Sequence, residues 1–257
     1  MLSVATTTAR LAALLEQTTH ATHAIRGNRP GPVWVGCGHE NDPSRGVALP
    51  RRALHEWLAQ APPQSLWTAA ATAAIERHPG TVFWVGPACW PWAAALPAGL
   101  RARSVFVNAP RRDQAARVWA ADLLLRSPAA AAVITDGRDL STAASRRLQL
   151  AAEAGDALAC LWRGEDERAL SVAHYRWRVT PQAHDGTRPR WRVKQLRSKD
   201  AAQLRTSALS PDPHGRNPTV FDVEVCDAEG LVVVSDPVAD RSRSANATPH
   251  DPSRRSA

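Results

Sequence analysis

The middle of the chain alternates between short apolar runs and helix-length segments. After Pro50, the runs that suit buried strands cover residues 53–58, 81–85, 104–107, 131–135 and 157–162. The segments that suit helices cover residues 64–77, 113–126 and 141–154. Continuous apolar runs are typical of parallel strands that are buried on both faces, and helices of this length can connect such strands. The pattern therefore predicts an α/β fold, with a mostly parallel sheet and helices on both of its faces.

From about residue 171 the pattern changes to an alternation of polar and apolar residues. The expected strands in this part cover residues 171–180, 189–196, 219–226 and 231–234. The sequence RWRV occurs twice, at residues 176–179 and 190–193, and we interpret the two copies as paired strands. The fold is therefore expected to add antiparallel C-terminal strands to the parallel sheet.

Both ends of the chain lack these regular patterns of apolar and polar residues. Residues 7–16 suit a short amphipathic helix with Leu11, Leu14 and Leu15 on one side. Residues 26–50 are rich in Gly, Pro and Arg, which predicts a linker or irregular structure. The last residues of the chain are polar and are expected to be disordered. The expected organisation is an N-terminal helix and linker at residues 1–46, one domain at 47–236 and a disordered tail at 237–257.

Charge and cysteine content narrow the classes of function. The formal net charge of +8 favours nucleic acid or an acidic protein as a partner. The four cysteines have no CxxC spacing, so we expect buried free thiols and predict neither a zinc site nor another cofactor. The sequence has no secretory signal and no apolar span of about 20 residues, which predicts a cytoplasmic protein without a membrane partner.

Basic residues concentrate around the two RWRV copies. Between Ser171 and Lys199 the sequence has eight Lys or Arg and one acidic residue, Asp185. Because alternate residues of a strand share a face, Trp177 and Trp191 are expected to pack inward, opposite a basic stripe. The candidate contact residues in this stripe are Arg176, Arg178, Arg190, Arg192, Lys194 and Arg197. A stripe of this kind suits a phosphate backbone, an acidic protein surface or a solvated sheet edge that resists aggregation, and all three interpretations stay open.

Four segments carry a resemblance to a known family. They are LPRRALHEW at 49–57, VWAADLLLRSPAAAAVITD at 118–136, TAASRRLQLAAEAG at 142–155, and the RWRV copies with the KQLRSKDA that follows. Over these segments the chain resembles the ImuA family, RecA-like accessory proteins of mutagenic DNA repair. The resemblance implies a RecA-like sheet and a role in the SOS response, with RecA and an ImuB-like relative of Y-family polymerases as partners.

The expected helix at residues 141–154 holds two further candidates, Arg146 and Arg147. Its apolar face is expected on the side of Leu148, which places Gln149 and Glu153 outward together with Arg146. Under the family resemblance, the two arginines are candidate contacts for a partner or for DNA. They equally suit ordinary exposed helix positions, paired for example with Glu153.

The sequence lacks a standard phosphate loop. Such a loop needs glycines, a Lys and a Ser or Thr, but the first Lys of the chain is Lys194. The resemblance implies that the loop would lie at residues 59–68. There Pro62 and Pro63 stand in place of flexible glycines, and Thr68 is the one match to a magnesium-binding hydroxyl.

Two further positions bear on ATP hydrolysis. RecA-type ATPases carry a catalytic Glu after the strand that corresponds to residues 81–85, but this chain reads GPAC there. Asp136 follows the expected strand at 131–135 and matches a Walker B carboxylate, or else caps a loop. We therefore expect a pseudo-ATPase rather than an enzyme.

These observations lead to one main hypothesis and two alternatives. The main hypothesis is a non-catalytic adaptor in SOS-induced translesion synthesis that binds an ImuB-like protein, RecA or both, with DNA as a further candidate. The alternatives are a SulA-like cell-division inhibitor that binds FtsZ, and a RecA-type ATPase with a non-standard phosphate loop.

Overall fold

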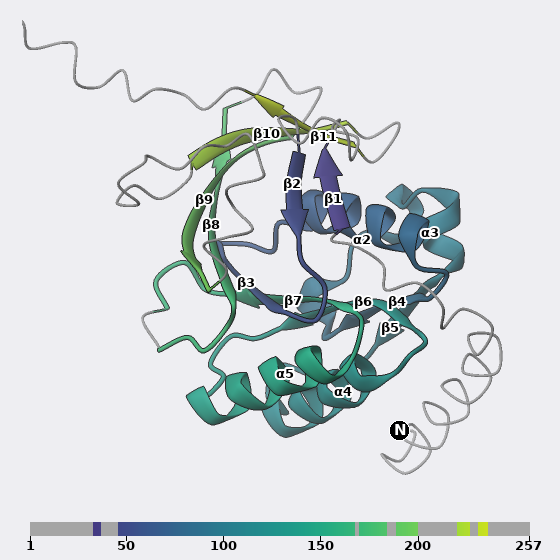
Figure 1. Cartoon of the computed structure of the whole chain (residues 1–257), viewed down its shortest axis with the longest axis vertical. Helices are drawn as coiled ribbons and strands as arrows, with labels where there is room; N and C mark the ends of the chain where they lie inside the picture. Colours follow the sequence, from purple (N-terminus) through teal and green to yellow (C-terminus); the bar gives the residue numbers. More distant parts are fainter. Residues whose placement is uncertain are drawn as a thin grey trace, which may run out of the picture.

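The core of the protein is one strongly curved sheet with helices packed on both faces (Figure 1). The computed structural model describes residues 33–36, 46–167, 170–183, 189–199, 220–226 and 231–235. Within these residues nine strands form the main sheet in the order β11-β10-β9-β8-β3-β7-β6-β4-β5. The predicted helix at 7–16 and the predicted tail at 237–257 lie outside the described residues.

The parallel half of the sheet is built from the apolar runs of the sequence. Its strands are β3 (Leu54–Leu58), β7 (Leu158–Arg163), β6 (Ala130–Asp136), β4 (Thr81–Val85) and β5 (Ser104–Val107). Each neighbouring pair in this half is parallel, so all five carboxyl ends meet at one edge of the sheet. This carboxyl edge is where open α/β sheets usually bind ligands.

The other half of the sheet turns antiparallel, as the change in sequence pattern predicts. Strand β8 (Tyr175–Gln182) is parallel to β3, and β9 (Arg190–Ser198), β10 (Val220–Cys226) and β11 (Leu231–Ser235) follow in antiparallel order. The strands that contain the two RWRV copies pair as predicted, and the copies themselves meet at Val179, which lies opposite Val193. The predicted mostly parallel sheet with antiparallel C-terminal strands is thus confirmed.

The helices divide between the two faces. Helices α2 (Gln64–Arg77) and α3 (Ala98–Ala102) cover one face, and α4 (Gln114–Arg126) and α5 (Thr142–Ala154) lie side by side on the other (Figure 1). Short 3₁₀ turns at Pro87–Cys89 and Ala93–Ala95 fill the connection from β4 to α3. Side-chain caps fix where α4 and α5 begin, because Asp113 accepts the N–H of Ala116 and Ser141 accepts the N–H of Ala144.

Each face of the sheet has its own hydrophobic core. Under α2 the largest buried side chains are indoles, including Trp67, Trp84 and Trp177. Under α4 and α5 the core is aliphatic and includes Leu124 and Leu148. A strand that faces both cores needs apolar side chains at every position, which explains why the parallel strands read as continuous apolar runs.

Gly155, which ends α5, owes its place to close packing. Its φ is −89°, so no left-handed conformation is involved. A Cβ at this position would lie 1.7 Å from the carbonyl oxygen of Leu125 in α4. The glycine therefore lets the end of α5 approach the backbone of α4.

One segment that the sequence analysis took as irregular contains regular structure. Strands β1 (Val33–Gly36) and β2 (Gly46–Leu49) pair in antiparallel register, with Val33 opposite Leu49. The prediction of irregular structure was wrong for these residues. Each strand is only four residues long and depends on its partner for hydrogen bonds, so neither leaves a clear periodic pattern in a local window.

Candidate functional site

The hairpin of β8 and β9 carries the predicted basic stripe on one face. Arg178 lies directly opposite Lys194, and Arg192 and Arg190 follow at alternate positions along β9. We call these four residues, Arg178, Arg190, Arg192 and Lys194, the basic face. Trp177 on the opposite face is 2% exposed, and the Nε1 of Trp191 donates to Ser65 Oγ of α2 at 3.0 Å. The predicted division of the hairpin into an inward indole face and an opposite basic face is confirmed, but only Arg178 and Arg190 are exposed, whereas Arg192 and Lys194 are half-buried.

Arg176 does not belong to the exposed stripe. Its Nε lies 3.0 Å from Glu56 Oε2, its Nη2 donates to the carbonyl of Glu167, and its side chain is 19% exposed. The register places Arg176 beside Glu56 of β3, a carboxylate that is 0% exposed. The prediction of a solvent-facing Arg176 was wrong because alternation within β8 gives no information about an acidic side chain on the neighbouring strand.

The remaining candidates of the hairpin have local partners. Arg197 is exposed, and its Nη1 donates to the carbonyl of Ser171 at 2.6 Å, which ties the end of β9 to the segment before β8. The strand register also sets Asp222 of β10 beside Arg192, and Glu224 beside Arg190. The charge excess counted along β8 and β9 thus leaves out two acidic positions that the register places on the neighbouring strand.

Arg146 and Arg147 lie on the outer surface of α5, as predicted, but differ in their contacts. Arg147 Nη2 donates to Asp122 Oδ2 of α4 at 2.8 Å. Partial burial acts to raise the pKa of Asp122, but hydrogen bonds from Arg147 and Arg126 hold that pKa below its ordinary value. Arg146 is exposed and forms no hydrogen bond or ion pair with another described residue. The suggested pairing with Glu153 is thus wrong for Arg147, whose acidic partner comes from another helix.

Gln149 is buried, although the sequence analysis placed it outward. Its Oε1 accepts the N–H of Leu54 in β3 and the N–H of His174, and its Nε2 donates to Glu153 Oε1. The side chain is 0% exposed. The helix packs against β3 and against the segment before β8, so its buried surface is wider than the apolar stripe, and a polar side chain fills the remaining part.

The turn from β3 to α2 stands where the resemblance expects a phosphate loop. It takes only residues 59–63, and the backbone groups of Ala59 are engaged within the chain. The N–H of Ala59 donates to the carbonyl of Arg163, and Trp162 Nε1 donates to the carbonyl of Ala59. Pro62 and Pro63 carry no N–H, and Gln64, the first residue of α2, donates its N–H to Pro62. This turn therefore offers few free donors to a phosphate.

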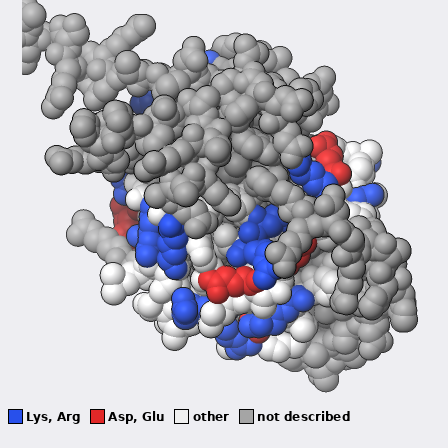
Figure 2. All heavy atoms as spheres, viewed as in Figure 1, with Lys and Arg blue, Asp and Glu red and all other residues white. Residues whose placement is uncertain are grey.

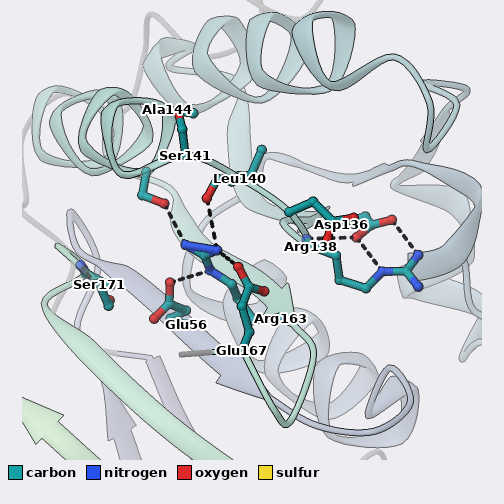
Figure 3. Close-up of polar contacts among 12 residues, drawn as sticks. Glu56, Asp136, Arg138, Leu140, Ser141, Ala144, Arg163, Glu167 and Ser171 are labelled. Carbon is teal, nitrogen blue, oxygen red and sulfur yellow. Dashed lines mark hydrogen bonds and ion pairs between the residues drawn. The ribbon is translucent and has the colours of Figure 1, made fainter. Parts of the chain in front are cut away.

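Asp136, the candidate Walker B carboxylate, is enclosed by arginines. Both of its oxygens accept from Arg138, with Nη2 to Oδ2 at 2.8 Å (Figure 3). Arg117 Nη1 lies 3.9 Å from Oδ2. Burial acts to raise the pKa of Asp136, but the Arg138 hydrogen bonds keep that pKa below its ordinary value. The guanidinium of Arg138 also lies 3.9 Å from the ring centre of Trp162. The chain itself thus supplies the cations that Asp136 contacts.

A second polar cluster lies at the carboxyl edge and was not predicted from the sequence. Arg163 ends β7 and is 0% exposed, and its Nε donates to Glu56 Oε1 at 2.8 Å. Its terminal nitrogens donate to Leu140 O, Ser145 Oγ and Glu167 (Figure 3). The sequence signal that could have revealed this cluster is one charged residue in each of two largely apolar strands, Glu56 in β3 and Arg163 in β7. The cluster joins β3, β7, α5 and the segment after β7.

The turn after β4 holds a buried thiol at the place where the resemblance expects a catalytic Glu. Cys89 is 0% exposed, and burial raises its pKa well above the ordinary value. Cys160 in β7 is also buried, which raises its pKa to about 12. The prediction of buried free thiols is confirmed for these two cysteines. Cys37 lies outside the described residues.

No family model matches the chain, and no curated protein does either. Of the helices that the structure describes, none combines the length and apolar character needed to cross a membrane. In the described ranges, no three His, Cys, Asp or Glu side chains are grouped so that they could hold a metal ion.

Proposed function

We propose that this chain is a non-hydrolysing, cytoplasmic adaptor in SOS-induced translesion synthesis. In this role it binds an ImuB-like relative of Y-family polymerases, RecA or both, with DNA as a further candidate partner. The observation that carries the proposal is the state of the carboxyl edge, where the chain's own side chains engage the groups that an ATPase would keep for nucleotide and magnesium. Asp136 is held by Arg138, and in the turn at residues 59–63 the carbonyl of Ala59 accepts from Trp162 Nε1.

Electrostatics support the absence of ATP turnover. A Walker B carboxylate acts on magnesium, but a cation would have to displace Arg138 from Asp136 and would then face Arg117. A phosphate would in turn meet two prolines in place of N–H donors. Purified protein is expected to show no ATP binding in calorimetry. Micromolar affinity with DNA-stimulated hydrolysis would establish the RecA-type ATPase alternative instead.

The basic face supports the binding role. Arg178 and Lys194 lie directly opposite each other across β8 and β9, and like charges in such a pair are destabilising. No acidic partner of either side chain occurs among the described residues. Such a destabilising pair is expected at a surface where a bound anionic partner offsets the repulsion. That partner is either a phosphate backbone or a carboxylate-rich protein surface.

The decisive experiment measures binding of purified ImuB-like protein, RecA and duplex DNA from the same source. Arg178→Glu with Lys194→Glu should weaken the complex at least about 10-fold, because charge reversal converts attraction into repulsion. Arg101→Glu on α3 is the matched control, since Arg101 lies on a helix that covers the other face of the sheet. If the unmodified chain binds neither ImuB-like protein nor RecA at moderate salt, the adaptor proposal is wrong. Binding to FtsZ, with filamentation on overexpression, would support the division-inhibitor alternative.

A further inference from the structure

Helices α4 and α5 present a mixed apolar and basic surface to solvent. On α4, Trp119 is 40% exposed, and on α5, Leu150 is 42% exposed. These two large side chains belong to helices whose other large apolar residues mostly pack against the sheet. A Trp that stays this exposed on a helix is typical of a protein contact surface.

The ion pair between the helices joins the two apolar side chains into one surface. Asp122 of α4 and Arg147 of α5 are linked at 2.8 Å. Trp119 lies three residues before Asp122, and Leu150 lies three residues after Arg147, so each apolar side chain is an i,i+3 neighbour of one member of the pair. We call this surface the α4–α5 face. Its residues are Trp119, Asp122, Arg126, Arg146, Arg147 and Leu150.

The charge of this face restricts what can cover it. It has three arginines against one aspartate, and that aspartate already accepts from Arg126 and Arg147. Arg146 has no acidic partner among the described residues. Figure 2 likewise shows more Lys and Arg than Asp and Glu on the visible described surface, including the lower part where α4 and α5 lie. The occupant is therefore expected to carry carboxylates around an apolar anchor.

Two other occupants fit this charge less well. A second copy of the chain would set these arginines against the same arginines across a two-fold axis. The chain's own residues 1–32 contain three arginines and one glutamate, so they are basic as well. An external acidic segment is the occupant that satisfies both the apolar and the charged side chains.

We propose that the α4–α5 face is a docking site for an acidic amphipathic protein segment, with Trp119 and Leu150 as apolar anchors and Arg146 as the specificity contact. This inference rests on the proposed adaptor function and gives it a second contact surface, separate from the basic face. Such a helix would lay its apolar stripe along Trp119 and Leu150 and place its carboxylates beside the arginines.

The test is fluorescence anisotropy of the full chain with a labelled model peptide of about 15 residues, in which leucines form one helical face and glutamates fill the rest. Trp119→Ala and Arg146→Glu should each weaken binding at least about 10-fold. The matched controls, Trp92→Ala and Arg101→Glu, should leave affinity unchanged, because Trp92 is 77% exposed on a different segment and Arg101 lies on α3. A peptide with lysine in place of glutamate should not bind. Unaltered melting curves verify that each variant is folded.

Several results would overturn the proposal. These are no binding of the glutamate peptide, equal binding of the lysine peptide, or equal losses in the controls. Concentration-dependent dimerisation that Trp119→Ala removes would identify a second copy as the occupant. Peptide binding that arises only when Leu11, Leu14 and Leu15 are changed to Ser would identify the N-terminal segment. The outcome is separable from the adaptor proposal, because peptide binding can follow this pattern even if neither ImuB-like protein nor RecA binds the chain.

Discussion

His55 should make the stability of the domain depend on pH between its ordinary pKa of 6.5 and its lowered pKa of about 4. The ring of His55, the second residue of β3, is 0% exposed and stacks on Tyr175 with ring centres 4.7 Å apart. Its Nδ1 must accept, because the indole of Trp177 is a pure donor, and its Nε2 then carries the proton that it donates to Pro50 O at 2.8 Å. Burial lowers the pKa of His55 to about 4 from its ordinary 6.5. The fold therefore requires the neutral ring.

The sign and size of the effect follow from this pKa. Below pH 6.5 the unfolded chain binds a proton at His55 that the folded chain does not bind. The contribution of His55 to stability therefore falls as the pH drops from 6.5 towards 4, and this contribution levels off below that. With 1.36 kcal/mol per pKa unit, the loss is about 2 kcal/mol between pH 7 and pH 4.5, approaching about 3 kcal/mol at lower pH. Urea unfolding of the full chain at both pH values measures it.

The His55→Gln variant isolates this contribution. Gln keeps a donor for Pro50 and an acceptor for Trp177 but does not titrate, so the variant should be less stable at pH 7 and lose about 2 kcal/mol less than the unmodified chain on acidification. Carboxylates and the other histidines are common to both proteins and cancel in the comparison. Equal losses in the two proteins would refute the argument that His55 is held neutral.

Three further predictions concern packing and buried charge. Arg163→Met should destabilise the domain by about 3 kcal/mol or more, because it leaves Glu56 buried with less compensation, and Glu56→Gln added to it should recover part of the loss in urea unfolding. A single variant within about 1 kcal/mol of the unmodified chain would contradict this. Gly155→Ala should cost about 1–3 kcal/mol, since its Cβ would overlap Leu125 O, and an unchanged melting temperature would show that the helix end yields easily. Cys160 should react with a thiol reagent only as fast as the domain opens, so rapid labelling of this thiol in the folded chain at pH 8 would contradict its burial.

The candidate site was predictable where a single strand or helix determines exposure. Alternation along β8 and β9 was sufficient to separate Trp177 and Trp191 from the basic residues, because side chains of a strand point to opposite faces in turn. It failed for Arg176, whose environment is set by Glu56 of a strand more than a hundred residues earlier in the chain. Exposure follows from local periodicity, whereas the pairing of charges does not.

By itself, the sequence determined the positions of helices α2, α4 and α5 and of the strands of the main sheet, and with them the α/β class, but not the short helix α3. Apolar runs of strand length and caps such as Ser141 act within a few residues, and such short-range effects can be read from a local window. Tertiary structure alone decided the order of the strands, the pairing of β1 with β2 and the burial of Gln149. It also decided that Arg138 would hold Asp136, and that Arg163 would join three elements. Those features depend on contacts between residues far apart in the chain, which no local pattern of hydrophobic and polar residues encodes.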